Sequence, residues 1–121
     1  MNAMINTHQV EGVTVMEVKG RITLGDGAVV LRDAIQDVLK AGTRKLVLDM
    51  GGVLYMDSAG LGELTLAYTS AANWDCDVRL ARLTAKLDEL MQITKLATVF
   101  DIYADEKQAV AALSSYQAAV A

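Results

Sequence analysis

The sequence predicts an α/β protein whose sheet joins one antiparallel hairpin to parallel strands. Two β-branched runs, Met4–Val10 and Val13–Val18, are separated by Glu11-Gly12, a two-residue connection typical of a hairpin. Beyond them, strand-like runs alternate with segments of helical period, which indicates parallel pairs with right-handed crossovers. The absence of proline favours regular elements joined by glycine-based turns. The expected order is β-β-α-β-α-β-α-β-α, a mixed sheet of about five strands with four helices.

The first predicted helix follows the hairpin. Gly20 is expected to end the second hairpin strand, and Gly25-Asp26-Gly27 to open the helix. Asp26 is available there to cap free N–H groups, and Gly42 is expected to stop the helix. The apolar positions of this helix recur at helical spacing: Leu31, Ile35, Val38 and Leu39.

The middle of the chain predicts a buried strand and a second helix. Lys45–Met50 (KLVLDM) is a compact apolar run, as in a central strand covered on both faces. A turn is expected at Gly51-Gly52, after which Val53–Met56 leads into Asp57-Ser58 and the helix. The expected buried stripe of that helix is Leu61, Leu64, Tyr68 and Ala71.

The last third predicts two more strands and two more helices. Apolar and polar residues alternate along Asp77–Arg82, as in a strand with one solvent-exposed face. Val99–Tyr103 is expected to be the final strand. Thr84 is expected to begin a short helix between them, and Asp105 with Gln108 resembles a capping box for the last helix. That last helix is expected to bury Val110, Leu113 and Tyr116.

Composition narrows the function classes. The 121 residues suit one domain, 1–121, and 53% hydrophobic with 21% charged residues suits a packed core. The net charge is −4 and the basic residues are scattered, which disfavours nucleic-acid binding. No apolar run approaches the roughly 20 residues of a membrane span, and no secretory leader pattern opens the chain. With Cys76 as the one cysteine, a cytoplasmic protein is expected.

The segment from Tyr55 to Leu64 (YMDSAGLGEL) carries the most information. It places Ser58 at or near a helix start, where unpaired N–H groups and positive partial charge favour a phosphate. Gly60 and Gly62 weaken that helix by roughly 1 kcal/mol each, which indicates a constraint other than helix stability. Two interpretations stay open. Asp57 or Ser58 is simply the N-cap with glycines for tight packing, or Ser58 is a functional serine that a partner approaches.

The string VLDMGGVLYMDSAGLGEL, from Val47 to Leu64, resembles the signature of STAS domains, named for sulfate transporters and anti-sigma factor antagonists. The Val-Lys-Gly-Arg-Ile string ending at Ile22 resembles the family's second strand and turn. The string LMQITKL from Leu90 to Leu96, followed by Val99-Phe100, resembles its third helix and last strand. The resemblance spans Met4 to Ala112 and implies the STAS fold.

In the antagonist branch of this family, the serine after the aspartate is phosphorylated, which here is Ser58. The resemblance implies a protein that binds an anti-sigma factor, a serine kinase of ATPase-type fold, while unphosphorylated. Phosphorylation releases it, and a PP2C-type phosphatase resets it, so that sigma-factor-dependent transcription is regulated without contact with DNA. No cofactor, metal or catalytic residue is expected. The expected partner-binding residues are Asp57, Ser58, Ala59, Gly60, Leu61 and Gly62.

Some features depart from the family pattern or favour other roles. Thr23 stands where many antagonists carry aspartate, the nearest acid being Asp26, and Ala59 stands where many carry a hydroxyl. Asp57 is expected either to hold the loop and orient the Ser58 hydroxyl or to be a plain cap. The alternative function is a non-switching STAS scaffold subunit of a stressosome-like or lipid-transport complex. An enzyme is disfavoured because the one histidine, His8, has no partners at catalytic or ligand spacing.

Overall fold

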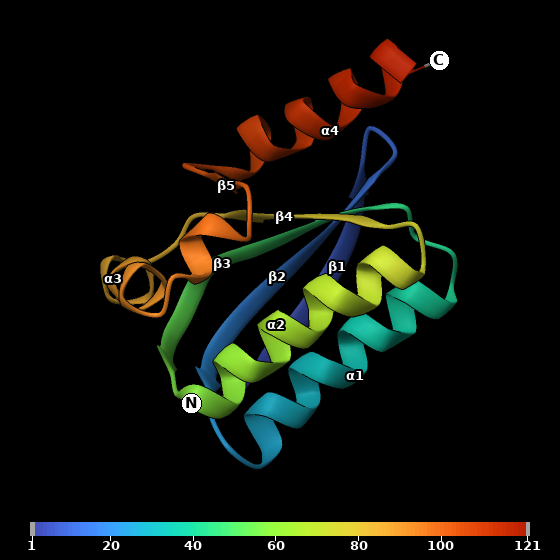
Figure 1. Ribbon diagram of the computed structural model, residues 1–121. Coiled ribbons are helices and arrows are strands. Elements are labelled where there is room, and N and C mark those ends of the chain that lie inside the picture. The colour runs from blue at the N-terminus through green and yellow to red at the C-terminus, as the bar shows by residue number, and fades with distance from the viewer. Residues whose placement is uncertain (1, 121) are drawn as a thin grey trace.

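A five-stranded mixed sheet in the order β1-β2-β3-β4-β5 forms the centre of the protein (Figure 1). This computed structural model describes the backbone of residues 2–120 and the side chains of residues 2–114. Only β1 and β2 pair antiparallel. The strands are β1 Met4–Val10, β2 Val13–Ile22, β3 Lys45–Met56, β4 Asp77–Ala81 and β5 Ile102–Tyr103. The helices are α1 Asp26–Lys40, α2 Ser58–Asn73, α3 Ala85–Ile93, the 3₁₀ turn η1 Leu96–Thr98 and α4 Glu106–Val120. The predicted fold class and element order are confirmed.

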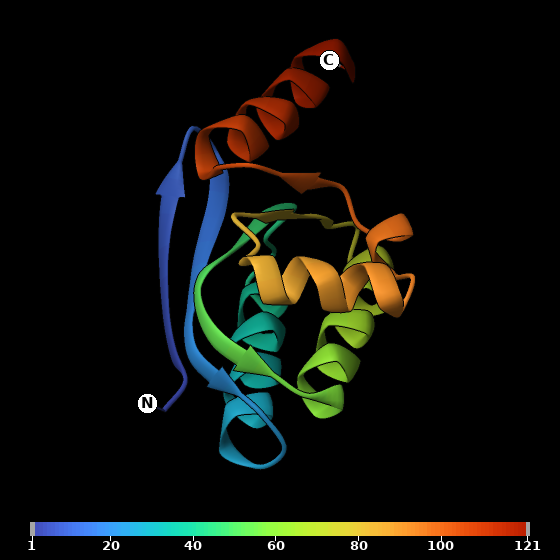
Figure 2. The same ribbon diagram turned by 90° about the vertical axis from the view of Figure 1, so that its left-hand side faces the viewer.

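The two faces of the sheet have separate apolar cores. Helices α1 and α2 lie side by side against one face, and α4 lies across the other (Figures 1 and 2). Side chains alternate between the faces along each strand, so Leu46 and Leu48 of β3 join the larger core while Val47 joins the smaller one. The smaller core consists of Val13, Val15, Val47, Ala81, Ala109, Val110 and Leu113. The side chain of Tyr116, expected to be buried, lies outside the described residues.

The hairpin forms as predicted, but β2 is longer than expected. Glu11 and Gly12 both have positive φ, 51° and 80°, as a tight type I′ turn requires. Gly20 does not end the strand, which runs on to Ile22. A Cβ on Gly20 would lie 2.3 Å from the backbone oxygen of Asn2, so this glycine permits a close approach of the chain that precedes β1.

The turn predicted at Gly51-Gly52 is wrong, because β3 continues through both glycines to Met56. Asp49 pairs with Glu17 and Gly52 with Lys19, so β3 carries an extra residue there, a β-bulge. The glycines make room for the long side chains of Arg82, which directly follows β4, and Lys19 of β2. A Cβ on Gly51 would lie 2.5 Å from the Arg82 guanidinium carbon, and one on Gly52 would lie 2.6 Å from Lys19 Cγ.

Two helix details also differ from expectation. Gly25 is the N-cap of α1 without a side-chain cap hydrogen bond, so Asp26 is an exposed residue of the first turn and not a cap. In α2, Ala67 is buried where Tyr68 was expected. Tyr68 is 47% exposed, and its ring and that of Phe100 pack in a T-shaped arrangement with their centroids 5.6 Å apart. A period of 3.6 residues allows either position to face inward, and the small alanine suits the close packing of α2 on the rest of the core.

The last third is largely as predicted. Thr84 caps α3 by accepting from Leu87 N, and Asp105 accepts from Gln108 N at 2.8 Å at the start of α4. The last strand is shorter than predicted, Ile102–Tyr103 only, because η1 and its cap residue Val99 occupy the chain before it. Within residues 2–120, no helix has the length and apolar character that crossing a bilayer requires.

The larger core predicts that a buried leucine contributes much more to the free energy of unfolding than an exposed one. We expect Leu48→Ala to lower the free energy of unfolding by about 2–5 kcal/mol, because Leu48 is fully buried and its removal leaves a cavity. Leu66→Ala is the matched control, since Leu66 is 56% exposed on α2 and should change stability by no more than about 0.5 kcal/mol. Urea unfolding followed by circular dichroism measures both. Equal losses would contradict the assignment of the core.

Candidate functional site

The Asp-Ser-x-Gly-Leu-Gly segment lies where β3 turns into α2, at the edge of the sheet where the parallel strands β2 and β3 both end. Asp57 is the N-cap of α2, and Ser58 is the first helical residue. Strand ends at this edge of an α/β sheet are a usual place for functional residues, because the loops there are set by a rigid scaffold.

The Asp57 carboxylate ties three backbone positions together. Its Oδ1 accepts from Ala59 N at 3.0 Å and Gly60 N at 3.1 Å, and its Oδ2 accepts from Leu24 N at 3.0 Å. The N–H of Leu24, followed by those of Gly60 and Ala59, lowers the pKa of Asp57 below its ordinary value. Asp57 is therefore an ionised cap that also holds the loop after β2. Among the described residues, no hydrogen bond joins it to the Ser58 hydroxyl.

Ser58 is exposed on the first turn of α2. Its hydroxyl has no hydrogen-bond partner within the described part of the chain, so it does not stabilise the fold through a hydrogen bond. The N–H groups of this turn carry the positive end of the helix dipole. Asp57 already engages two of these groups, those of Ala59 and Gly60.

The two glycines of the segment have different surroundings. Gly60 is buried, and a Cβ there would lie 2.4 Å from the backbone oxygen of Ile22, so α2 can approach β2 only with glycine at this position. Gly62 is exposed, and a Cβ there would meet nothing within 4 Å. Leu61 is buried in the larger core. The surface part of the segment is therefore Asp57, Ser58, Ala59 and Gly62.

Exposed apolar side chains flank this segment in the loop after β2 and at the end of β3. Leu24, whose N–H binds Asp57, is 82% exposed, and Leu54 and Tyr55 at the end of β3 are 59% and 49% exposed. The guanidinium of Arg21 lies 5.2 Å from the centre of the Tyr55 ring, a cation–π contact. A groove of about 380 Å³ runs between this end of β3 and α3, where Ile93 is 70% exposed. Exposed apolar residues gathered in this way are typical of a protein-docking surface.

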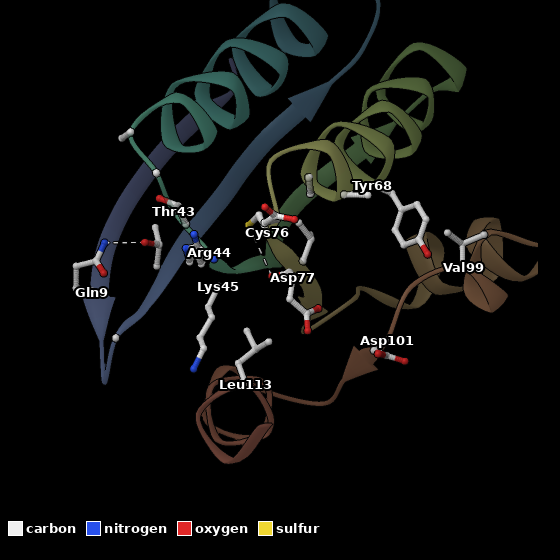
Figure 3. Close-up of a pocket in the computed structure, with 18 residues that line it drawn as sticks. Gln9, Thr43, Arg44, Lys45, Tyr68, Cys76, Asp77, Val99, Asp101 and Leu113 are labelled. Atoms are coloured by element: carbon white, nitrogen blue, oxygen red, sulfur yellow. Dashed lines mark hydrogen bonds between the residues drawn. The ribbon is translucent and has the colours of Figure 1, made fainter. Parts of the chain in front are cut away.

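A larger hollow of about 1100 Å³ lies at the other end of the sheet (Figure 3). It is lined by Lys45 and Asp77, where β3 and β4 begin, and by Leu113 of α4. None of residues 57–62 lines it. Cys76 also lies there, and burial followed by the charge of Asp77 raises the pKa of its thiol to about 11, which disfavours the reactive thiolate.

Sequence reasoning missed one cluster, the carboxylates of Glu17, Asp49 and Glu106, which the fold brings together on the α4 face of the sheet. The available signal was a charged residue inside each of two apolar strands, Val13–Val18 and Lys45–Met50. His8 stands beside this cluster on β1, with its Nε2 3.9 Å from Glu106 Oε1. It therefore lies on the opposite face of the sheet from α2.

The STAS domain family model matches residues 4–109, and the chain belongs to this family. Its structural neighbours include anti-sigma factor antagonists. One from Mycobacterium paratuberculosis has a TM-score of 0.83 at 23% identity, over 92% of this chain and 93% of that chain. The Bacillus cell fate determinant SpoIIAA in its phosphorylated form has a TM-score of 0.70 at 14% identity, over 91% and 99%. A sulfate transporter family protein from Wolinella succinogenes has a TM-score of 0.68 at 17% identity, over 83% of each chain. At these identities the likeness shows the fold.

The two glycines of the segment give a matched test of the site's geometry. We expect Gly60→Ala to lower the free energy of unfolding by about 1–3 kcal/mol, because the added methyl group collides with the Ile22 carbonyl. Gly62→Ala should be neutral or stabilise by up to about 1 kcal/mol, since alanine favours the helix and the space is open. Urea unfolding compares the two, and a loss of stability in Gly62→Ala equal to that in Gly60→Ala would contradict this geometry.

Proposed function

We propose that this protein is a cytoplasmic anti-sigma factor antagonist that is switched by phosphorylation of Ser58. Unphosphorylated, it binds an anti-sigma factor that is also a serine kinase of ATPase-type fold, and so frees a sigma factor for transcription. Phosphorylated, it releases this partner, and a PP2C-type phosphatase restores the binding form. The observation that carries the proposal is the exposed hydroxyl of Ser58 on the first turn of α2, beside the Asp57 cap and without a hydrogen-bond partner among the described residues.

The charge balance at the helix start supports a switch that acts on binding and not on folding. A phosphate adds about −1.5 to −2 charges at neutral pH. The helix dipole offsets part of that charge, which spares the fold. Asp57 is ionised and already engages the N–H groups of Ala59 and Gly60, so much of the added charge stays uncompensated. A partner that covers this surface would have to desolvate that charge.

The surroundings of Ser58 support a partner that docks with apolar contacts. Leu24 in the loop after β2 and Leu54 and Tyr55 at the end of β3 are exposed, and the groove beside α3 offers space for a partner side chain. Phosphate placed within such a surface disfavours docking by desolvation cost and by repulsion from Asp57. Gly62 leaves the exposed face of α2 without side-chain bulk, so that a partner backbone can come close.

The site does not support hydrolase chemistry at Ser58. A serine nucleophile needs a base within hydrogen-bond reach, and the protein's one histidine, His8, lies on β1 at the α4 face. We therefore propose a binding protein without catalytic residues or a cofactor. The surface that the anti-sigma factor binds is then also the surface that it phosphorylates.

The proposal predicts one phosphorylation site and a charge-dependent change of affinity. Incubation with the cognate anti-sigma kinase and ATP should place phosphate on Ser58, as mapped by mass spectrometry, and Ser58→Ala should remain unmodified. Ser58→Asp should bind the anti-sigma factor at least about tenfold more weakly than the wild type, a change of roughly 1.4 kcal/mol, in isothermal titration calorimetry.

Ser58→Asn is the control for size, because asparagine matches aspartate in volume without its charge. It should bind more tightly than Ser58→Asp, and circular dichroism should show both variants folded. Phosphate on another residue, or equal affinities of Ser58→Asp and the wild type, would contradict the switch. Equal binding by all variants without phosphorylation would instead favour a non-switching scaffold subunit, as in a stressosome-like or lipid-transport complex.

A further inference from the structure

Three carboxylates meet on the face of the sheet that α4 covers, away from Ser58. Glu17 lies on β2, Asp49 pairs with it on β3, and Glu106 is the first residue of α4. One oxygen of each lies within 4.8 Å of the other two. The register of β2 and β3 and the docking of α4 therefore bring together residues that are far apart in the sequence.

Asp49 is the buried member of this cluster, with 1% of its surface exposed. Its Oδ1 accepts from Gly51 N at 3.0 Å and from Arg82 Nε at 2.8 Å. Its Oδ2 is buried and has no hydrogen-bond partner among the described residues. A buried carboxylate oxygen without a partner is costly, so such an oxygen needs a further ligand to explain it.

The charges of the cluster do not balance. With all three carboxylates ionised, the cluster faces one guanidinium, that of Arg82, and carries a formal charge of −2 when His8 is neutral. Arg82 is held on the Oδ1 side of Asp49, over the space that Gly51 leaves, and so does not reach the unpartnered oxygen. A single divalent cation would both neutralise the cluster and fill the missing contact of Asp49.

We propose that Glu17, Asp49 and Glu106 bind one divalent cation of the oxygen-preferring class, Mg²⁺, Mn²⁺ or Ca²⁺. The donors are all carboxylate oxygens, which these hard cations prefer over zinc-type sulfur and nitrogen sets. Glu17 and Glu106 are only half-buried, so water can complete the coordination shell. Arg82 and the Gly51 N–H act as outer partners that orient the Asp49 carboxylate.

Such a cation would tie the first turn of α4 to the centre of the sheet. Glu106 belongs to α4, whereas Glu17 and Asp49 belong to the two strands that α4 crosses. Ion binding would then stabilise the docking of α4 without touching the Ser58 surface, which lies at the end of β3. The site is independent of the proposed switch, and its failure would leave that switch unaffected.

A proton is the competing way to neutralise the cluster. A proton shared between Asp49 and Glu106 would also satisfy the unpartnered oxygen of Asp49. Because a cation binds only the deprotonated carboxylates, competition from the proton weakens as the pH rises. The test is therefore made at pH 8.

The experiment titrates Mn²⁺ into the full chain after treatment with EDTA and dialysis. Electron paramagnetic resonance should show one bound Mn²⁺ per chain, with Mg²⁺ or Ca²⁺ competing. The unfolding midpoint should rise by roughly 5–10 °C at about one hundred times the dissociation constant. Glu17→Gln should bind Mn²⁺ at least about tenfold more weakly. It removes one ligand and leaves the buried Asp49 intact.

Asp37→Asn is the matched control, because Asp37 is an exposed acid on α1 and its loss changes the net charge equally. This variant should bind Mn²⁺ like the wild type. Absence of Mn²⁺ binding at pH 8 would overturn the site, as would equal affinities for Glu17→Gln and the wild type. An unfolding midpoint that rises on acidification through pH 7 and does not change with Mn²⁺, Mg²⁺ or Ca²⁺ would show that a shared proton neutralises the cluster. This result would also overturn the metal site.

Discussion

The arrangement of the proposed switch depends on one carboxylate, that of Asp57. Strands β2 and β3 are parallel and end at the same edge, so the loops that follow them must be held together there. Asp57 accepts from Leu24 N in one loop and from Ala59 N and Gly60 N in the helix after the other. Gly60 lets α2 come close enough for this geometry. The position of Ser58 is thereby fixed, although its own side chain makes no hydrogen bond to any residue that the structure describes.

The same carboxylate decides what an anion at Ser58 can do. A bare helix start would bind a phosphate through its N–H groups and hide its charge. Here the cap has already engaged two of these groups, and its ionised form adds a like charge beside the serine. Modification would therefore change the surface that a partner meets more than it changes the stability of the helix. This separation of folding from binding is what a reversible switch requires.

The two faces of the sheet carry different chemistry because side chains alternate along each strand. On β3, Leu46 and Leu48 face α1 and α2, whereas Val47 and Asp49 face α4. The core on the first face is apolar, whereas the second face adds a buried carboxylate next to its apolar residues. The edge where β3 ends bears the proposed partner surface. A ligand on the α4 face and a phosphate at the edge can thus act without interfering.

The sequence by itself determined the hairpin, the alternation of strands and helices, and the place of Ser58 at the start of α2. These features follow from local patterns, since periodicity, caps and tight turns depend on residues close in the chain. Only the tertiary structure decided that β3 passes through Gly51-Gly52, that Ala67 is buried in place of Tyr68, and that three distant carboxylates meet. Each of these depends on how closely one element approaches another. That distance is set by packing between segments, which no local pattern records.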